Sequence, residues 1–298
     1  MKFGRTRGRG FYPTFLRLVL LFLLAAISAQ AEPQRIVSTS PSITEALFAL
    51  GLGPRVVGVS NYCEYPPQVK DLPKVGTFLR PDAERIARLK PDLVIVNKLP
   101  NDLTNRLAAL HIPYAEVDQG GLTDAYSEIR EIGEAAGAKE RADKLVATMR
   151  SRLDHIRTQM AGKKKPRVIF VIGRDPGTLS NIIAVGQDNF LNELIEVAGG
   201  INIIAQESTQ PYPHISLETI LREHPDVLID MGDMGDSPAE RQRKAAENRA
   251  LWNAVPNLSA VQNGRVYCLT STAFVVPGPR ITEAAETLFS ILQGKKPE

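Results

Sequence analysis

The chain has few aromatic residues and very few cysteines. Aromatic residues make up 6% of its 298 residues, and Cys63 and Cys268 are the only cysteines. Two cysteines in an oxidising compartment can form a disulfide, but the internal repeat described below places these two in different halves of the chain. Because a bridge between the halves would lock any cleft between them, we expect buried or free thiols.

Signatures of common enzyme classes are missing as well. The sequence contains no Gly-x-Ser-x-Gly turn, no Walker phosphate loop, no Cys-x-x-Cys pair and no His-Glu-x-x-His motif. Its four histidines are scattered, with no spacing that would bring three of them to one metal: His111, His155, His214 and His224. His214 falls in a loop, where it either contacts a ligand or caps the loop. We expect a non-enzymatic protein with no metal site and no cofactor.

Residues 1–31 have the pattern of a secretory signal. Arginines give a basic start, an apolar run follows from Leu18 to Ala26, and Ala29-Gln30-Ala31 resembles a cleavage site. The alternative is an uncleaved single-helix anchor. No cysteine lies at the cut, so nothing supports a lipid anchor there. We expect a cleavable leader and a periplasmic protein.

The leader also explains the positive charge of the full chain. It carries five of the 36 lysines and arginines and none of the 33 acidic residues, which leaves the remainder at −2. The remainder shows no basic stripe with interleaved aromatics, so we expect no nucleic-acid partner.

One sequence pattern occurs twice. Glu-Arg-Ile-Ala-Arg-Leu-Lys-Pro-Asp-Leu-Val-Ile begins at Glu84, and Glu-Thr-Ile-Leu-Arg-Glu-His-Pro-Asp-Val-Leu-Ile begins 134 positions later, at Glu218. A second echo pairs residues 42–51 with 190–199, each an amphipathic segment closed by glycine. Duplication at this spacing predicts two similar lobes that hold something between them.

Apolar runs alternate with helical patterns, which predicts an α/β fold with parallel sheets. The expected strands are 35–38, 56–59, 93–96, 114–117, 168–172, 227–230 and 265–269. The longest helical pattern follows the first set of strands, from Ala142 to Met160, and it either packs on one lobe or connects both as a rigid spine. We favour the spine. The predicted division is a signal peptide 1–31, an N-terminal lobe 34–137, a linker helix 138–165 and a C-terminal lobe 166–298, closed by a helix at 281–292.

Loops that follow the predicted strands concentrate the aromatic residues. An α/β lobe places its binding groups at the carboxyl ends of its strands. The loops there contain Tyr62, Tyr65, Phe78, Tyr212 and Phe274. They either contact a flat apolar ligand in the cleft or pack beneath the prolines of ordinary loops.

Glu84 and Glu218 begin the two copies of the repeated helix. A carboxylate in the first turn complements the helix dipole, and Ser216 is placed to cap the second copy. The alternative is that the two glutamates, one from each lobe, meet arginines on a pseudo-symmetric partner. From charge alone the dipole role is favoured.

The sequence resembles the class III substrate-binding proteins of ABC importers, and most closely their cobalamin-binding branch. The resemblance covers residues 35–292 and rests on five segments: Ser-Pro-Ser-Ile-Thr-Glu (40–45), the run 56–67, Val-Gly-Thr-Phe (75–78), the first copy of the repeat (84–95) and Pro-Arg-Ile (279–281).

The resemblance implies two Rossmann-like lobes with parallel sheets, joined by a single long backbone α-helix around a shallow cleft. It implies a monomer that captures cobalamin or a related corrinoid and delivers it to a permease and its ATPase, with Glu84 and Glu218 docking on the permease. The ligand contacts it implies are Ser40, Pro41, Tyr62, Cys63, Phe78, Asn97, Arg174, Tyr212, Thr272 and Phe274. Asn97 replaces an aromatic residue of the family pattern, and Thr272-Ala273 replaces an acidic-aromatic pair.

Other cargoes of the same fold remain open. Haem binders use a tyrosinate, and Tyr65 falls near that position. Siderophore binders use arginines, for which Arg174 is the candidate in the cleft loops. Related two-lobed folds also include metal chelatases, an enzymatic alternative that the leader and the scattered histidines disfavour.

Overall fold

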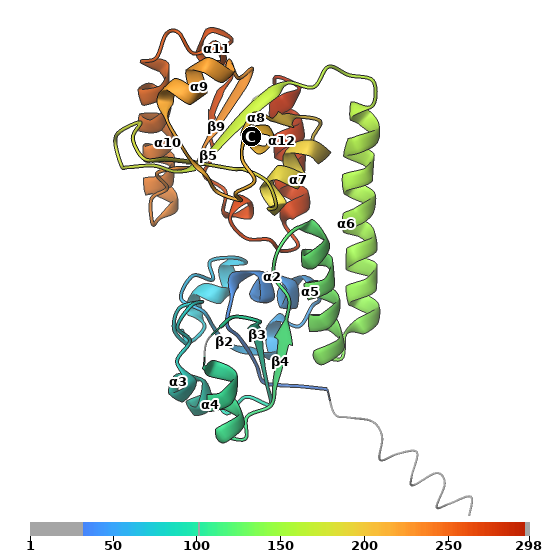
Figure 1. Ribbon diagram of the computed structural model, residues 1–298. Coiled ribbons are helices and arrows are strands. Elements are labelled where there is room, and N and C mark those ends of the chain that lie inside the picture. The colour runs from blue at the N-terminus through green and yellow to red at the C-terminus, as the bar shows by residue number, and fades with distance from the viewer. Residues whose placement is uncertain (1–31, 101, 296–298) are drawn as a thin grey trace, which may run out of the picture. The chain divides into compact units, whose positions relative to one another are not determined.

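The computed structural model describes residues 32–295 except 101, and Gln34 onward forms one compact unit (Figure 1). The predicted leader lies outside the described residues. Within the described part of the chain, no helix is both long and apolar enough to cross a membrane.

The first half of this unit contains a four-stranded parallel sheet. Its strand order is β2-β1-β3-β4, and all three pairings are parallel. The strands are β1 (Ile36–Ser38), β2 (Val56–Val59), β3 (Leu93–Asn97) and β4 (Tyr114–Val117). The helices are α2 (Pro41–Ala49), α3 (Ala83–Arg88), α4 (Leu103–Ala109) and α5 (Leu122–Ala135), with short 3-10 turns at Gly53–Arg55 and Pro67–Asp71.

The second half contains a six-stranded sheet of order β10-β9-β5-β6-β8, with β7 paired to β5. Its strands are β5 (Arg167–Gly173), β6 (Ile182–Ala184), β7 (Ile201–Asn202), β8 (His214–Ile215), β9 (Val227–Asp230) and β10 (Val266–Cys268). Its helices are α7 (Phe190–Val197), α8 (Ile203–Glu207), α9 (Leu217–Glu223), α10 (Pro238–Asn253), α11 (Ser259–Gln262) and α12 (Ile281–Leu292), with a 3-10 turn at Thr272–Phe274.

The second sheet corrects the expectation of two purely parallel sheets. β6 runs antiparallel to β5, and β8 runs antiparallel to β6. The sequence did not predict β6, β7 or β8, because each is only two or three residues long and too short to establish a periodicity. The seven predicted strands are all present, and no end is shifted by more than one residue.

Helix α6 (Lys139–Met160) connects the two sheets along the chain. Its buried face repeats at helical spacing and contacts α5 from the first half and α7 and α12 from the second (Figure 1). The prediction of a fold with one long helix joining two α/β halves is confirmed. The exact lobe boundaries stay a prediction.

The repeated Pro-Asp segment makes the same contact in both halves. Asp92 accepts a hydrogen bond from the backbone N–H of Arg35 at 2.8 Å, and Asp226 accepts one from that of Arg167 at 2.9 Å. Each arginine in turn donates to carbonyls at the end of the repeated helix. The sequence repeat therefore marks an equivalent helix-to-strand junction in each half.

Candidate ligand-binding cleft

Two adjoining cavities, of about 190 and 300 Å³, lie where the loops of the two halves meet. They share Pro41 and Tyr62 from the first half and Val275 and Val276 from the second. The smaller cavity is completed by Ser40, Ser42, Phe78, Gln119 and Pro277. The larger is completed by Glu45, Glu64, Tyr65, Met234, Arg241, Thr272 and Arg280. Together they form the candidate cleft.

The β1–α2 junction supplies the floor of the cleft. Ser40 is the N-cap of α2, in extended conformation, and its side chain accepts from the backbone N–H of Ile43. Pro41 occupies the first helical turn, where its missing N–H costs nothing. This junction lies at the carboxyl end of a central strand, where parallel α/β sheets place their ligands.

Three aromatic side chains from the first half line the cavities: Tyr62, Tyr65 and Phe78. Tyr62 follows β2 and is 63% exposed. Phe78 follows Gly76, whose φ of +102° and close approach to the Arg80 carbonyl (2.7 Å from an added Cβ) permit no side chain there. Opposite them, Val275 is 53% exposed. The cleft therefore presents aromatic rings on one side and an aliphatic wall on the other.

A buried ion pair joins the two halves beside the cleft. The Arg280 guanidinium donates to both carboxylate oxygens of Glu45, and the two side chains are only 10% and 3% exposed. Arg280 also donates to the Thr272 hydroxyl at 3.0 Å and lies over the Tyr65 ring, 4.1 Å from its centroid. Burial raises the pKa of Glu45, while the hydrogen bond from Arg280 opposes that rise.

A second ion pair crosses the cleft at the larger cavity. Arg241 on α10 donates to the Glu64 carboxylate at 2.6 Å. Both cationic side chains that line this cavity therefore bond to carboxylates from the opposite half.

A carboxyl group lies buried beneath the floor of the cleft. Glu128 on α5 accepts from the Ser42 hydroxyl at 2.8 Å and from the Asn97 amide at 3.1 Å. Burial raises the pKa of Glu128 to about 8, against the lowering effect of these two hydrogen bonds. The group is therefore predominantly protonated at neutral pH.

Five of the ten predicted ligand contacts line the cavities: Ser40, Pro41, Tyr62, Phe78 and Thr272. Tyr212 is exposed in the loop before β8 and lines neither cavity, and His214 lies exposed in β8 itself. Their roles stay predictions.

Cys63 and Asn97 lie inside the first half and do not reach the cleft surface. The Cys63 thiol is 3.1 Å from the Thr44 hydroxyl, and burial raises its pKa to about 11. Asn97 donates to Glu128 from the end of β3. Cys63 and Cys268 are both free and buried, as expected from the sequence.

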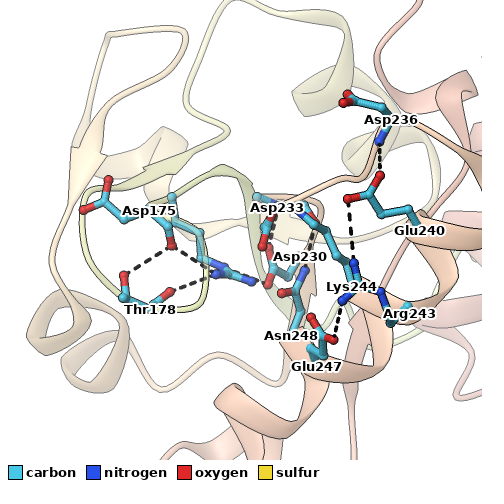
Figure 2. Close-up of polar contacts among 12 residues, drawn as sticks. Asp175, Thr178, Asp230, Asp233, Asp236, Glu240, Arg243, Lys244, Glu247 and Asn248 are labelled. Atoms are coloured by element: carbon cyan, nitrogen blue, oxygen red, sulfur yellow. Dashed lines mark hydrogen bonds and ion pairs between the residues drawn. The ribbon is translucent and has the colours of Figure 1, made fainter.

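Arg174 and Phe274 are interior residues of the second half. The Arg174 guanidinium is fully buried and bonds to Asp230 at 3.2 Å and to the carbonyls of Asp175 and Thr178. Figure 2 shows these three partners. Phe274 packs edge-on against Phe170, with the ring centroids 5.9 Å apart. Both side chains are buried and neither lines the two cavities of the cleft, so their roles as ligand contacts stay predictions.

Sequence reasoning missed the aliphatic wall and both arginines of the cleft. The wall, Val275 to Pro277, begins directly after Phe274, the last aromatic residue assigned to the binding loops, so the loop was recognised but its end was not. Arg280 belongs to the Pro-Arg-Ile segment that carried the resemblance. Arg241 lies in a strongly charged helix, where no sequence signal distinguishes it.

Glu84 and Glu218 occupy equivalent, exposed positions in the first turns of α3 and α9. The caps are other residues, Asp82 for α3 and Ser216 for α9. A hydrogen bond to its own backbone N–H, with a further one from Ser216, lowers the pKa of Glu218. Neither glutamate is needed as an N-cap. Among the described residues, no group of three His, Cys, Asp or Glu is placed to hold a metal ion.

Comparisons with known proteins find substrate-binding proteins of similar sequence. The vitamin B12-binding protein of Vibrio cholerae is 31% identical over 278 residues, which cover 92% of this chain and 94% of that protein. An uncharacterized ABC transporter substrate-binding lipoprotein of Bacillus subtilis, YvrC, is 32% identical over 270 residues. The match covers 88% of this chain and 81% of that protein.

Solved structures show the same fold. The periplasmic vitamin B12 binding protein BtuF of Vibrio cholerae superposes with a TM-score of 0.71 at 30% identity, covering 88% of this chain and 97% of that one. The apo form of the periplasmic heme-binding protein RhuT from Roseiflexus sp. RS-1 gives 0.74 at 27% identity, covering 88% and 98%. The periplasmic binding protein family profile matches residues 36–273. The chain therefore belongs to the periplasmic binding protein family.

Proposed function

We propose that this protein captures cobalamin or a related corrinoid in the periplasm and hands it to the permease and ATPase of an ABC importer, without catalysing a reaction. The observation that carries the proposal is the cleft itself. It sets Tyr62 and Phe78 opposite the wall of Val275 and Val276, in a chain that matches vitamin B12-binding proteins over nearly their whole length.

The physical basis is burial of a large, flat ligand between two apolar faces. Tyr62 and Val275 are among the most exposed large apolar side chains of the described residues, and they line the same cavities. Covering such surface is favourable by about 25 cal/mol per Å². The hydroxyls of Ser40 and Thr272 supply a few polar contacts that fix orientation, as is typical of small-molecule sites.

Docking on the permease and export to the periplasm complete the proposed function. Glu84 and Glu218 are exposed at equivalent positions of the two halves, which suits a pseudo-symmetric permease. The protein acts as a monomer, and residues 1–31 direct export and are removed.

Haem is the second candidate, and one observation favours it. Tyr65 is partly exposed in the larger cavity and its ring lies against the Arg280 guanidinium. Tyrosine is one of the residues that can ligate haem iron. A ferric siderophore has less support, because Arg174, its candidate contact, is buried against Asp230.

Calorimetric titration with cyanocobalamin, haemin and a ferric siderophore tests the choice, together with the visible spectrum and native mass of protein recovered from the periplasm. Saturable 1:1 binding of cyanocobalamin, tighter than that of the other two, is expected. Tighter haemin binding, with a tyrosinate-to-iron band lost in Tyr65→Phe, would favour haem. No binding of any macrocycle would overturn the proposal.

A further inference from the structure

The two ion pairs that cross the cleft differ in how deeply each partner is buried. In the Arg280–Glu45 pair both side chains are buried, at 10% and 3% exposure. In the Arg241–Glu64 pair the guanidinium is 8% exposed, but the carboxylate is 46% exposed. In the first pair both side chains are shielded from solvent, whereas in the second pair only the guanidinium is.

This asymmetry makes Glu64 replaceable. A buried guanidinium must keep an acceptor, because a buried charge without a partner is strongly unfavourable. A half-exposed carboxylate can leave and be hydrated at little cost. Glu45, in contrast, is buried and would not be hydrated if its bond to Arg280 broke. We propose that Arg241 is an oxyanion subsite, which Glu64 fills while the cleft is empty and which a carboxylate or phosphodiester of the ligand fills when the cleft is occupied.

The surroundings of Arg241 favour an anion from the cleft over a partner from its own helix. Arg241 lies in the first two turns of the 16-residue helix α10, where the backbone dipole attracts negative charge. The other charged groups of this stretch already have partners: Lys244 bonds to Asp233, and Glu240 accepts from the backbone of Asp236 (Figure 2). Within the described part of the chain, the partner found for Arg241 comes from the opposite half.

The subsite adds to the proposed function, on which its choice of ligand rests. A flat macrocycle held by Tyr62 and Val275 can still rotate in its plane. An oxyanion bonded to Arg241 at the edge of the cavity would fix that rotation, because a guanidinium recognises carboxylate and phosphate oxygens directionally. Cyanocobalamin carries a phosphodiester in its nucleotide loop, and haem carries two propionate carboxylates, so either cargo brings a suitable group.

A small probe tests the subsite without a macrocycle. Benzoate is titrated into the full chain while the guanidinium N–H signal of Arg241 is followed by NMR, assigned by its loss in Arg241→Lys. We expect the signal to shift, and Glu64→Gln to bind benzoate roughly tenfold more tightly, the change expected when a competing charge-assisted hydrogen bond is removed. Glu247→Gln, which removes an exposed carboxylate from the same helix, is the matched control and should behave as wild type.

Equal benzoate affinity in wild type and Glu64→Gln, or no shift of the Arg241 signal, would overturn the subsite. This outcome is independent of the proposed function, which fails only if no macrocycle binds the wild-type protein.

Matched macrocycles then identify the oxyanion. Cobinamide is a corrinoid without the nucleotide loop, and haemin dimethyl ester lacks the free propionates. If Arg241 binds the phosphodiester, Glu64→Gln should raise the preference for cyanocobalamin over cobinamide roughly tenfold. If Arg241 binds a propionate carboxylate, Glu64→Gln should raise the preference for haemin over its dimethyl ester by a similar factor. Preferences unchanged in both pairs would contradict the role of the subsite in ligand recognition.

Discussion

Arg280 and Glu45 bond to each other from opposite halves of the molecule, 235 positions apart in the chain. Glu45 ends the Ser-Pro-Ser-Ile-Thr-Glu segment, and Arg280 is the centre of Pro-Arg-Ile. Two of the segments that carry the resemblance to binding proteins therefore meet in one ion pair. Their role in this structure is to hold the halves together beside the cleft.

Removing one partner of this pair should be costly. Glu45→Gln or Arg280→Gln leaves the other side chain buried without its charge partner, and we expect each to lower the free energy of unfolding by about 3 kcal/mol. The double variant should lose less than the sum of the two, by about 1 kcal/mol or more. Urea unfolding of the four proteins measures this coupling.

The Arg152–Glu286 pair is the control, because it joins α6 to α12 on the surface, with both side chains more than 40% exposed. The same cycle with glutamine there should give a coupling of at most about 1 kcal/mol. Equal couplings at the two sites would contradict the importance assigned to the buried pair.

Tyr62 should contribute strongly to ligand binding. Tyr62→Ala removes an exposed ring shared by both cavities, and we expect a loss of about 1 to 3 kcal/mol in the binding free energy of cyanocobalamin, with a similar effect for Phe78→Ala. Calorimetric titration measures both. Tyr114→Ala changes a partly exposed tyrosine on β4 that lines neither cavity and should leave binding unchanged. Full affinity in both cleft variants would argue against stacking.

The structure predicts a pH effect at Glu128. Its pKa is raised from 4.5 to about 8 in the folded protein, so the unfolded chain releases this proton at lower pH than the folded one. The stabilising contribution of the neutral carboxyl is complete below about pH 4.5 and is lost as pH rises towards 8, by about 1.4 kcal/mol per pH unit.

Glu128→Gln isolates this effect, because glutamine keeps an oxygen to accept from Ser42 and Asn97 and does not titrate. The free energies of unfolding of wild type and variant are measured by urea titration from about pH 4 to about pH 9. As pH rises from about 5 to about 8, wild type should lose stability relative to the variant. Parallel curves over that range would show that Glu128 titrates normally.

Reversing the charge of Glu84 and Glu218, the two glutamates proposed to dock on the permease, should separate transport from capture. In Glu84→Lys with Glu218→Lys, we expect cyanocobalamin affinity to be retained and uptake by whole cells to be abolished, because the changed residues lie outside both cavities. The same reversal at the exposed residues Glu116 and Glu134 is the control and should leave uptake intact. Normal uptake by the first variant would restrict its glutamates to a dipole role.

Structural elements that follow a long or repeated sequence pattern could be predicted from the sequence. The buried face of α6 follows a helical periodicity over about five turns. The Pro-Asp repeat identified the matching helix-to-strand junctions. Strands β6 and β8 could not be predicted, because they contain three and two residues and are held by pairing with β5 and with each other. Their antiparallel direction is a tertiary property.

The site was only half predictable, for a related reason. A position after a strand suggests a binding loop, but it does not indicate which side chains turn inward. Arg174 and Tyr62 both follow strands, yet Arg174 turns inward to the buried carboxylate of Asp230, whereas Tyr62 is 63% exposed. The pairing of Arg241 with Glu64 depends on two segments 177 positions apart, which no local pattern can report.

Trp252 is the only tryptophan of the chain, and its indole N–H bonds to Asp230 at 2.7 Å inside the second half. It lines neither cavity of the cleft, so its fluorescence cannot respond to direct contact with cargo there. A coloured macrocycle will instead quench it by resonance energy transfer. Trp252 is thus a fixed intrinsic fluorescence donor, and the extent of its quenching reports its distance from the bound chromophore without an attached label.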